Sequence, residues 1–263
     1  MGHIHMPRLP ATRRWQQVIE LLAGGASVAQ LATATIYAAE RGLRAATDDP
    51  GVLEALWLLV RVPLAARTPD FAGALRACGC EVSDQPGLLD VAVALGAAVD
   101  ARMPDGKGRT DLAEMAQTAA VETINATVGP RAATLWGSGP EEVRAAFASL
   151  GTPAKFGAFA RQFFSRFSFK TINYFLSKTV GEHIGAGRRF PTVAEQSRFT
   201  DALRTHCHEA TKIVEEYAGD WFSKHRFESA GDISREETRG FLGYAMRTKL
   251  SGEFRRREGR RGS

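Results

Sequence analysis

The sequence predicts an all-α fold of about ten helices with no significant β-sheet. Apolar residues recur at spacings of three and four along most of the chain, which matches the helical period. The alternation of apolar and polar residues that is typical of a strand is not sustained over four positions. A composition of 44% hydrophobic and 24% charged residues in a chain of 263 is that of a folded protein with one large or two modest domains.

Helix starts are marked by residues that satisfy the free amides of a first turn. The capping-box pattern, a hydroxyl followed three residues later by a carboxylate or amide, occurs at Ser27 with Gln30, Thr192 with Glu195, and Ser234 with Glu237. Proline at a first helical position, which loses no hydrogen bond, marks two further starts at Pro50 and Pro140.

These signals, with the glycine and proline clusters that separate them, place the helices in order. The predicted ranges are 12–23, 28–46, 50–66, 69–78, 86–101, 111–128, 140–150, 153–179, 193–228 and 235–257. The helix at 50–66 carries the longest apolar run, which is about half the length of a membrane span and includes Arg61 and Pro63. We therefore expect a buried helix there, and no membrane segment.

The composition changes at Gly137-Ser138-Gly139-Pro140. Residues 1–137 are rich in alanine and poor in aromatic side chains, whereas residues 138–263 are rich in aromatic side chains and end in a basic tail. We predict two helical regions with this boundary, and the sequence leaves open whether they share a core.

The net charge of +5 lies in the last seventeen residues. Residues 247–263 hold seven basic and two acidic side chains, and removing them from the 34 basic and 29 acidic residues leaves 27 of each. Within this neutral body, residues 143–181 carry six basic side chains and no acidic one, and residues 190–246 carry seven basic and ten acidic ones. A clustered charge of this kind is a candidate binding surface.

The helix at 153–179 combines an aromatic stripe with a basic edge. Phe156, Phe163, Phe167 and Tyr174 fall on one side of the helix at 100° per residue, with basic residues on the adjoining flank. Rings beside cations suit single-stranded nucleic acid, whereas a core face with a solvated basic edge is the structural alternative. The candidate contacts for a nucleic acid or a protein partner are Lys155, Arg161, Arg166, Lys170, Arg188, Arg189 and the tail residues Arg255, Arg256, Arg257, Arg260 and Arg261.

Motifs for catalysis and metal binding do not emerge. Cys78 and Cys80 are too close for a zinc or redox motif, and neighbouring His206 and His208 point in different directions on a helix. We expect no metal site, no cofactor and no catalytic residues, with reduced thiols in a cytoplasmic protein because no targeting segment is evident. An enzyme site built from His183, His206 and His208 stays open as a third hypothesis, and it requires these side chains to converge in one pocket.

The leading hypothesis is a non-enzymatic helical subunit that binds a partner protein within a multicomponent complex. A bacterial source is indicated by 27 arginines against seven lysines, together with the abundance of alanine and glycine, which is typical of high-GC coding sequences. The alternative hypothesis is a nucleic-acid-binding module that uses the basic aromatic helix and the arginine-rich tail.

Overall fold

Every regular element in the described part of the chain is a helix. The computed structural model describes residues 12–39, 46–103, 110–133 and 139–246. Within these ranges no residue belongs to a β-strand, and β-type pairing is limited to isolated bridge residues, among them the pair Ile184 and Phe190. The predicted all-α class is confirmed.

The elements follow the predicted order closely. They are α1 (Arg13–Ala23), α2 (Val28–Ala38), α4 (Pro50–Ala65), α5 (Phe71–Ala77), α6 (Leu88–Ala101), α7 (Asp111–Ala132), α8 (Pro140–Ser149), α9 (Pro153–Val180), the 3-10 turn η1 (Gly181–His183), α10 (Val193–Ala210), α11 (Lys212–Glu228) and α12 (Arg235–Tyr244). The capping boxes at Ser27 and Ser234 both form, with reciprocal bonds to Gln30 and Glu237.

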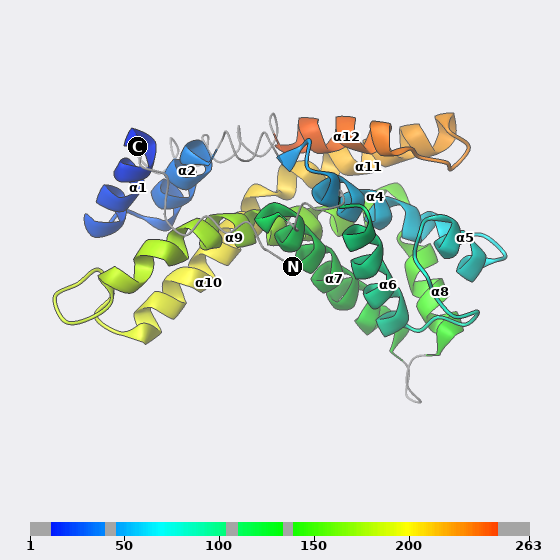
Figure 1. The fold of residues 1–263 in the computed structure, drawn as a ribbon, viewed down its shortest axis with the longest axis horizontal. Helices are drawn as coiled ribbons and strands as arrows, with labels where there is room; N and C mark the ends of the chain where they lie inside the picture. The colour runs from blue at the N-terminus through cyan, green and yellow to red at the C-terminus, as the bar shows by residue number, and fades with distance from the viewer. Residues whose placement is uncertain (1–11, 40–45, 104–109, 134–138, 247–263) are drawn as a thin grey trace.

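Helix α9 is the longest of the described helices, and four other helices pack against it (Figure 1). Its 28 residues extend over roughly 42 Å at 1.5 Å per residue. Helices α7, α10, α11 and α2 pack along it. Helices α1 and α2 lie at one end of the molecule, and α5 and α8 lie at the other.

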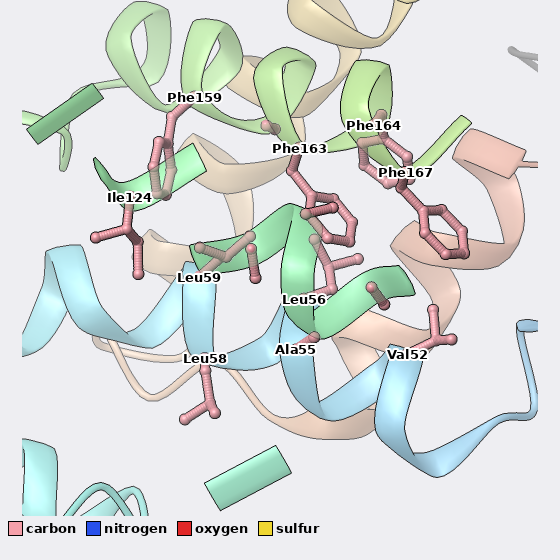
Figure 2. Close-up of a cluster of buried hydrophobic side chains, with 14 of the residues drawn as sticks. Val52, Ala55, Leu56, Leu58, Leu59, Ile124, Phe159, Phe163, Phe164 and Phe167 are labelled. Carbon is pink, nitrogen blue, oxygen red and sulfur yellow. The ribbon is translucent and has the colours of Figure 1, made fainter. Parts of the chain in front are cut away.

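Helix α4 is the most deeply buried element. Each residue from Gly51 to Val60 is buried, including Glu54, and the apolar run from Ala55 to Val60 predicted most of this burial. Leu56 and Leu59 point toward Phe159 and Phe163 of α9 in Figure 2. A helix that is apolar on nearly every side is stable only when other helices cover it, and α6, α7, α8 and α12 provide that cover.

The two predicted regions share one hydrophobic core. A continuous cluster of buried side chains runs from Trp15 and Leu56 in the first region to Phe163 and Phe222 in the second. The indole of Trp57 also donates a hydrogen bond of 3.0 Å to the carbonyl of Ile233. The change of composition near residue 137 is therefore not a boundary in packing.

The predicted helix at 193–228 is two helices that meet at Thr211. The Thr211 hydroxyl donates to the carbonyls of Cys207 and His208 at 3.0 and 2.9 Å. Arg161 of α9 donates to the same His208 carbonyl from Nε and Nη2 at 3.3 and 3.1 Å. The Cys207 carbonyl still accepts from the Thr211 amide, whereas at the His208 carbonyl these side-chain donors take the place of the Lys212 amide, and α10 ends there.

One predicted helix end differs from the structure, and another is not tested. Helix α2 ends at Ala38, whereas the prediction extended it to residue 46. Helix α12 spans Arg235–Tyr244 and is followed by two π-helical residues, after which the described range ends, so the predicted end at residue 257 lies outside it. Residues 40–45 and 247–263 lie outside the described ranges.

Candidate functional site

The aromatic stripe of α9 belongs to the core. Phe156, Phe163 and Phe167 are at most 1% exposed, and Phe156 stacks on Phe222 with ring centroids 4.1 Å apart. Tyr174 is half-buried, and its hydroxyl donates to the Asp111 carboxylate at the start of α7. Because a nucleic-acid base can stack only on an open ring, these phenylalanines are not a stacking platform. The basic edge of α9 remains as the candidate.

Arg161 forms contacts that hold neighbouring helices together. Its guanidinium bonds to the His208 carbonyl at the end of α10 and to the Glu215 carboxylate of α11, the latter at 2.8 Å. It thus joins three helices at the α10–α11 break. The sequence could not show this, because the acceptors lie 47 and 54 residues away.

Arg166 and Lys170 lie one turn apart on α9 and face α7. Glu122 of α7 lies 2.8 Å from Lys170 Nζ and 4.0 Å from Arg166 Nε. Arg166 Nη1 donates to Gln162 twice, at 2.6 Å to its side-chain oxygen and at 3.1 Å to its carbonyl. Arg166 is therefore held in one orientation, and its Nη2 has no partner among the described residues.

The other predicted contact residues lie away from this pair. Lys155 is exposed on the first turn of α9, roughly 16 Å from Arg166 along the helix axis. Arg188 is exposed in the loop that follows η1. Arg189 Nη2 donates to the carbonyl of Ala26 at 2.8 Å, so Arg189 joins this loop to the α1–α2 turn. The tail residues Arg255, Arg256, Arg257, Arg260 and Arg261 lie outside the described residues.

A hollow of about 460 Å³ opens beside Arg166 and Lys170, between α7, α9 and α10. This volume falls in the range of ligand pockets. We call it the cationic hollow. Its lining residues are Glu122, Gln162, Ser165, Arg166, Phe169, Lys170, Arg204, Thr205 and His208.

Arg204 of α10 was not among the predicted contact residues, because residues 190–246 are acidic as a whole. His208 was considered only as part of a possible metal or enzyme site. The spacing of four residues that places Arg204 and His208 on one helix face was the signal that could have paired them. The Arg204 guanidinium lies 4.4 Å from the ring centroid of Phe169, and no carboxylate of the described residues pairs with it.

Burial and the repulsion from neighbouring positive charges lower the pKa of two residues that line the hollow, Arg166 and His208. Burial lowers the pKa of Arg166 against the opposing charge of Glu122, and the charge of Arg204 lowers it further. Burial and the charges of Arg161 and Arg166 lower the pKa of His208 below its ordinary value of 6.5. An anion in the hollow would relieve this repulsion, which makes the site favourable for negative charge.

Two smaller hollows continue from the first along α9. One of about 410 Å³ shares Phe169 and Lys170 with it and is bordered by Asp111 and Glu114 of α7. The next, of about 300 Å³, shares Asn173 with the second and is lined by apolar and uncharged polar residues: Asn173, Leu176, Ser177, Val180, Gly181, Ile184, Gln196, Phe199 and Thr200. We call the three together the α9 groove. Its floor extends from Gln162 to Val180, roughly 27 Å.

The three histidines of the enzyme hypothesis do not line one pocket. His208 lines the cationic hollow, His206 is buried, and His183 lies in η1 at the far end of α9. In the described ranges, no three side chains of the metal-ligating types come together.

Comparisons with protein-family models, with curated proteins and with solved structures find no match to this chain. Among the helices that the structure describes, none has both the length and the hydropathy needed to cross a bilayer.

Proposed function

We propose that this protein is a non-enzymatic helical subunit that binds a partner protein through the α9 groove. The observation that carries the proposal is the cationic hollow. There Arg204 is exposed and has no carboxylate partner among the described residues, and it lies beside Arg166, which Gln162 holds in one orientation. An acidic side chain of the partner would occupy the cationic hollow and pair with Arg204, as in other recognition of acidic motifs by arginine.

The change in chemistry along the groove favours a polypeptide. Cations line its first part, the Asp111 and Glu114 carboxylates border the second, and Leu176, Val180 and Phe199 line the third. A polypeptide can match this order with an acidic, a basic and an apolar side chain, and about eight extended residues would span it. A nucleic-acid backbone carries the same charge at each step, and the α7 carboxylates would repel it.

The proposed setting is a multicomponent complex in the bacterial cytoplasm. Cys78, Cys80 and Cys207 are free and buried, which suits a reducing compartment. Nucleic-acid binding stays as the alternative, and the concentration of positive charge in residues 247–263 is the observation that favours it.

The test is affinity purification of the full chain from its native cells, with and without nuclease, compared by quantitative mass spectrometry. Arg204→Glu reverses the charge at the groove, and Lys155→Glu makes the same change at an exposed position on the first turn of α9. We expect nuclease-resistant partner proteins that are lost with Arg204→Glu and kept with Lys155→Glu.

Two results would overturn the proposal. The first is equal recovery of every co-purifying protein with both variants. The second is recovery of nucleic acid alone, lost when residues 247–263 are deleted. Circular dichroism and thermal unfolding of both variants confirm that each is folded.

A further inference from the structure

The cationic hollow holds more positive charge than one carboxylate would neutralise. Arg166, Lys170 and Arg204 supply three positive charges, and Glu122 is the one acidic side chain that lines it. About two positive charges therefore remain. A phosphoryl dianion carries enough negative charge to neutralise both, whereas a carboxylate neutralises one. This comparison rests on the proposed function, since it concerns the group that the partner inserts.

The hydrogen-bond donors also suit a phosphoryl group, which has three acceptor oxygens. Arg166 Nη2 and the Arg204 guanidinium come from two different helices and have no carboxylate partner within the described chain. Ser165 adds a hydroxyl to the lining, whereas the Thr205 hydroxyl donates to the Asp201 carbonyl at 3.1 Å. Gln162 orients Arg166 and the Phe169 ring supports Arg204, so both arginines are positioned before a ligand enters.

Glu122 competes with a bound anion for Lys170. Its carboxylate holds Lys170 at 2.8 Å and is 46% exposed, so it can move toward solvent when another anion takes the lysine. Removing its charge should therefore tighten anion binding. A purely structural role for the Glu122 ion pair predicts no such gain.

We infer that the cationic hollow binds a phosphorylated serine or threonine side chain of the partner, held by Arg166 and Arg204 with Lys170. The first measurement is calorimetric titration of the full chain, at constant ionic strength, with a capped Gly-phosphoserine-Gly peptide and its Gly-Ser-Gly and Gly-Glu-Gly counterparts. Inorganic phosphate and a fifteen-residue oligothymidylate test the other sources of phosphate.

We expect the phosphoserine peptide to bind at least about tenfold more tightly than the glutamate peptide. Arg204→Ala should weaken its binding at least about tenfold, and Glu122→Gln should strengthen it. Lys155→Ala is the matched control and should change nothing. Equal binding of the phosphoserine and glutamate peptides, or tighter binding of the oligothymidylate, overturns the inference.

A second readout uses His208. Burial and the charges of Arg161 and Arg166 of α9 lower the pKa of His208, and the charges of Glu215 of α11 and Glu209 of α10 raise it. A bound dianion cancels the repulsion and raises the pKa of His208, so a proton is taken up on binding. Sulfate stays a dianion over the range from about pH 8 to about pH 5.5, and its affinity for the protein should rise as the pH falls across that range. His208→Gln should remove this rise. A variant whose sulfate affinity depends on pH as that of wild type does contradicts the inference.

The two proposals fail separately. If the glutamate and phosphoserine peptides bind equally and both depend on Arg204, the phosphoryl assignment fails and an acidic partner segment stands. If partner capture is the same with Arg204→Glu, the proposed function fails whatever the peptides do.

Discussion

Glu54 is the buried carboxylate on which several contacts between α4 and α12 depend. Its side chain is 3% exposed, and both oxygens accept from Arg235 at 2.7 Å. The Arg235 guanidinium also lies 3.5 Å from the ring centroid of Trp57, and Arg102 Nε lies 3.6 Å from Glu54. Buried charge of this kind is stable only while its partner is present.

Arg235→Ala should lower the free energy of unfolding by about 3 kcal/mol, because it leaves the buried Glu54 charge with Arg102 alone. Urea denaturation measures the change. Arg239→Ala on the same helix removes only an exposed pair with Glu236, and it should cost less than about 1 kcal/mol. Equal losses from the two variants would contradict this account of Glu54.

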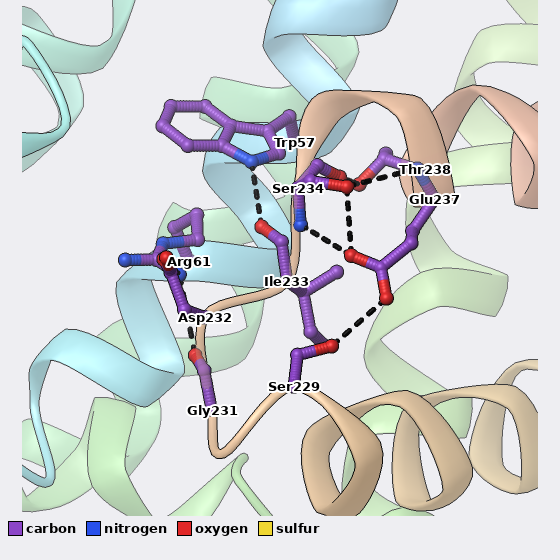
Figure 3. Close-up of polar contacts among 9 residues, drawn as sticks. All are labelled: Trp57, Arg61, Ser229, Gly231, Asp232, Ile233, Ser234, Glu237 and Thr238. Atoms are coloured by element: carbon purple, nitrogen blue, oxygen red, sulfur yellow. Dashed lines mark hydrogen bonds and ion pairs between the residues drawn. The ribbon is translucent and has the colours of Figure 1, made fainter.

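Glu237 makes stability depend on pH at the start of α12. The Ser234 amide and hydroxyl and the Ser229 hydroxyl all donate to its carboxylate (Figure 3). The Ser234 backbone bond is the largest cause that lowers the pKa of Glu237 below its ordinary value of 4.5. The stabilisation is therefore present above about pH 4.5 and is lost as the pH falls through the lowered pKa.

Glu237→Gln keeps the capping geometry without the titration. We expect wild-type stability to fall more steeply than that of the variant as the pH drops below about 4.5. Urea midpoints across this range measure the difference. Glu216→Gln, at an exposed position, should show the same dependence of the urea midpoint on pH as wild type. If Glu237→Gln shows that same dependence, Glu237 is not the group that links stability to pH.

At the scale of the element, α9 and α11 approach closely because glycines lie at their contact. A Cβ atom at Gly157 would lie 2.3 Å from the Glu215 carbonyl oxygen, and one at Gly219 would lie 2.8 Å from that of Pro153. Both obstacles are main-chain atoms, so relief requires the helices to separate.

Gly157→Ala should therefore destabilise the protein by about 1–3 kcal/mol despite the better helix propensity of alanine. Gly240→Ala, in α12 with open space around the added carbon, should instead gain about 0.5–1 kcal/mol. Thermal or urea unfolding gives both values, and a gain from Gly157→Ala would show that the contact is looser than described.

The break between α10 and α11 depends on Arg161. Arg161→Gln should lower the free energy of unfolding by about 1–2 kcal/mol, because the Glu215 carboxylate loses the charged donor at 2.8 Å and the His208 carbonyl keeps only the bond from the Thr211 hydroxyl. Its effect on binding of the phosphoserine peptide should stay below about threefold, since Arg161 does not line the hollow. Weakening as large as that from Arg204→Ala would instead place Arg161 in the binding site.

At the scale of the whole molecule, the absence of acidic residues from 143 to 181 is balanced by other helices. Glu122 of α7 neutralises Lys170, and Glu215 of α11 neutralises Arg161. The charge separation along the sequence is therefore partly cancelled in space. Arg204 of α10 adds a third cation to Arg166 and Lys170, so that the lining of the hollow exceeds the charge of Glu122 by two rather than by one.

A shared core predicts that the two regions unfold together. Burial raises the pKa of Cys80 to about 12, with the neighbouring Cys78, Glu54 and Glu81 adding to the effect. Burial raises the pKa of Cys207 to about 12 as well. Because the thiolate is the reactive form, both should react with iodoacetamide only when the protein opens.

We expect Cys80 and Cys207 to be alkylated in step as urea is increased, with the midpoint of global unfolding. Peptide mass spectrometry resolves the two sites. Modification of one thiol well before the other would show that the regions unfold separately.

The sequence by itself determined the all-α class, most helix starts and the burial of α4. These features depend on interactions between residues three or four apart, or on a continuous apolar run, and both can be read along the chain. Ser27 with Gln30 and the run in α4 are examples.

Only the tertiary structure decided which predicted cations lie together around a hollow. Arg161 and Arg189 are used in contacts between elements, whereas Arg166 and Lys170 meet Arg204, which lies more than thirty residues further along the chain. The physical reason is that the partners of each charge come from other helices, and the sequence does not show which helices meet.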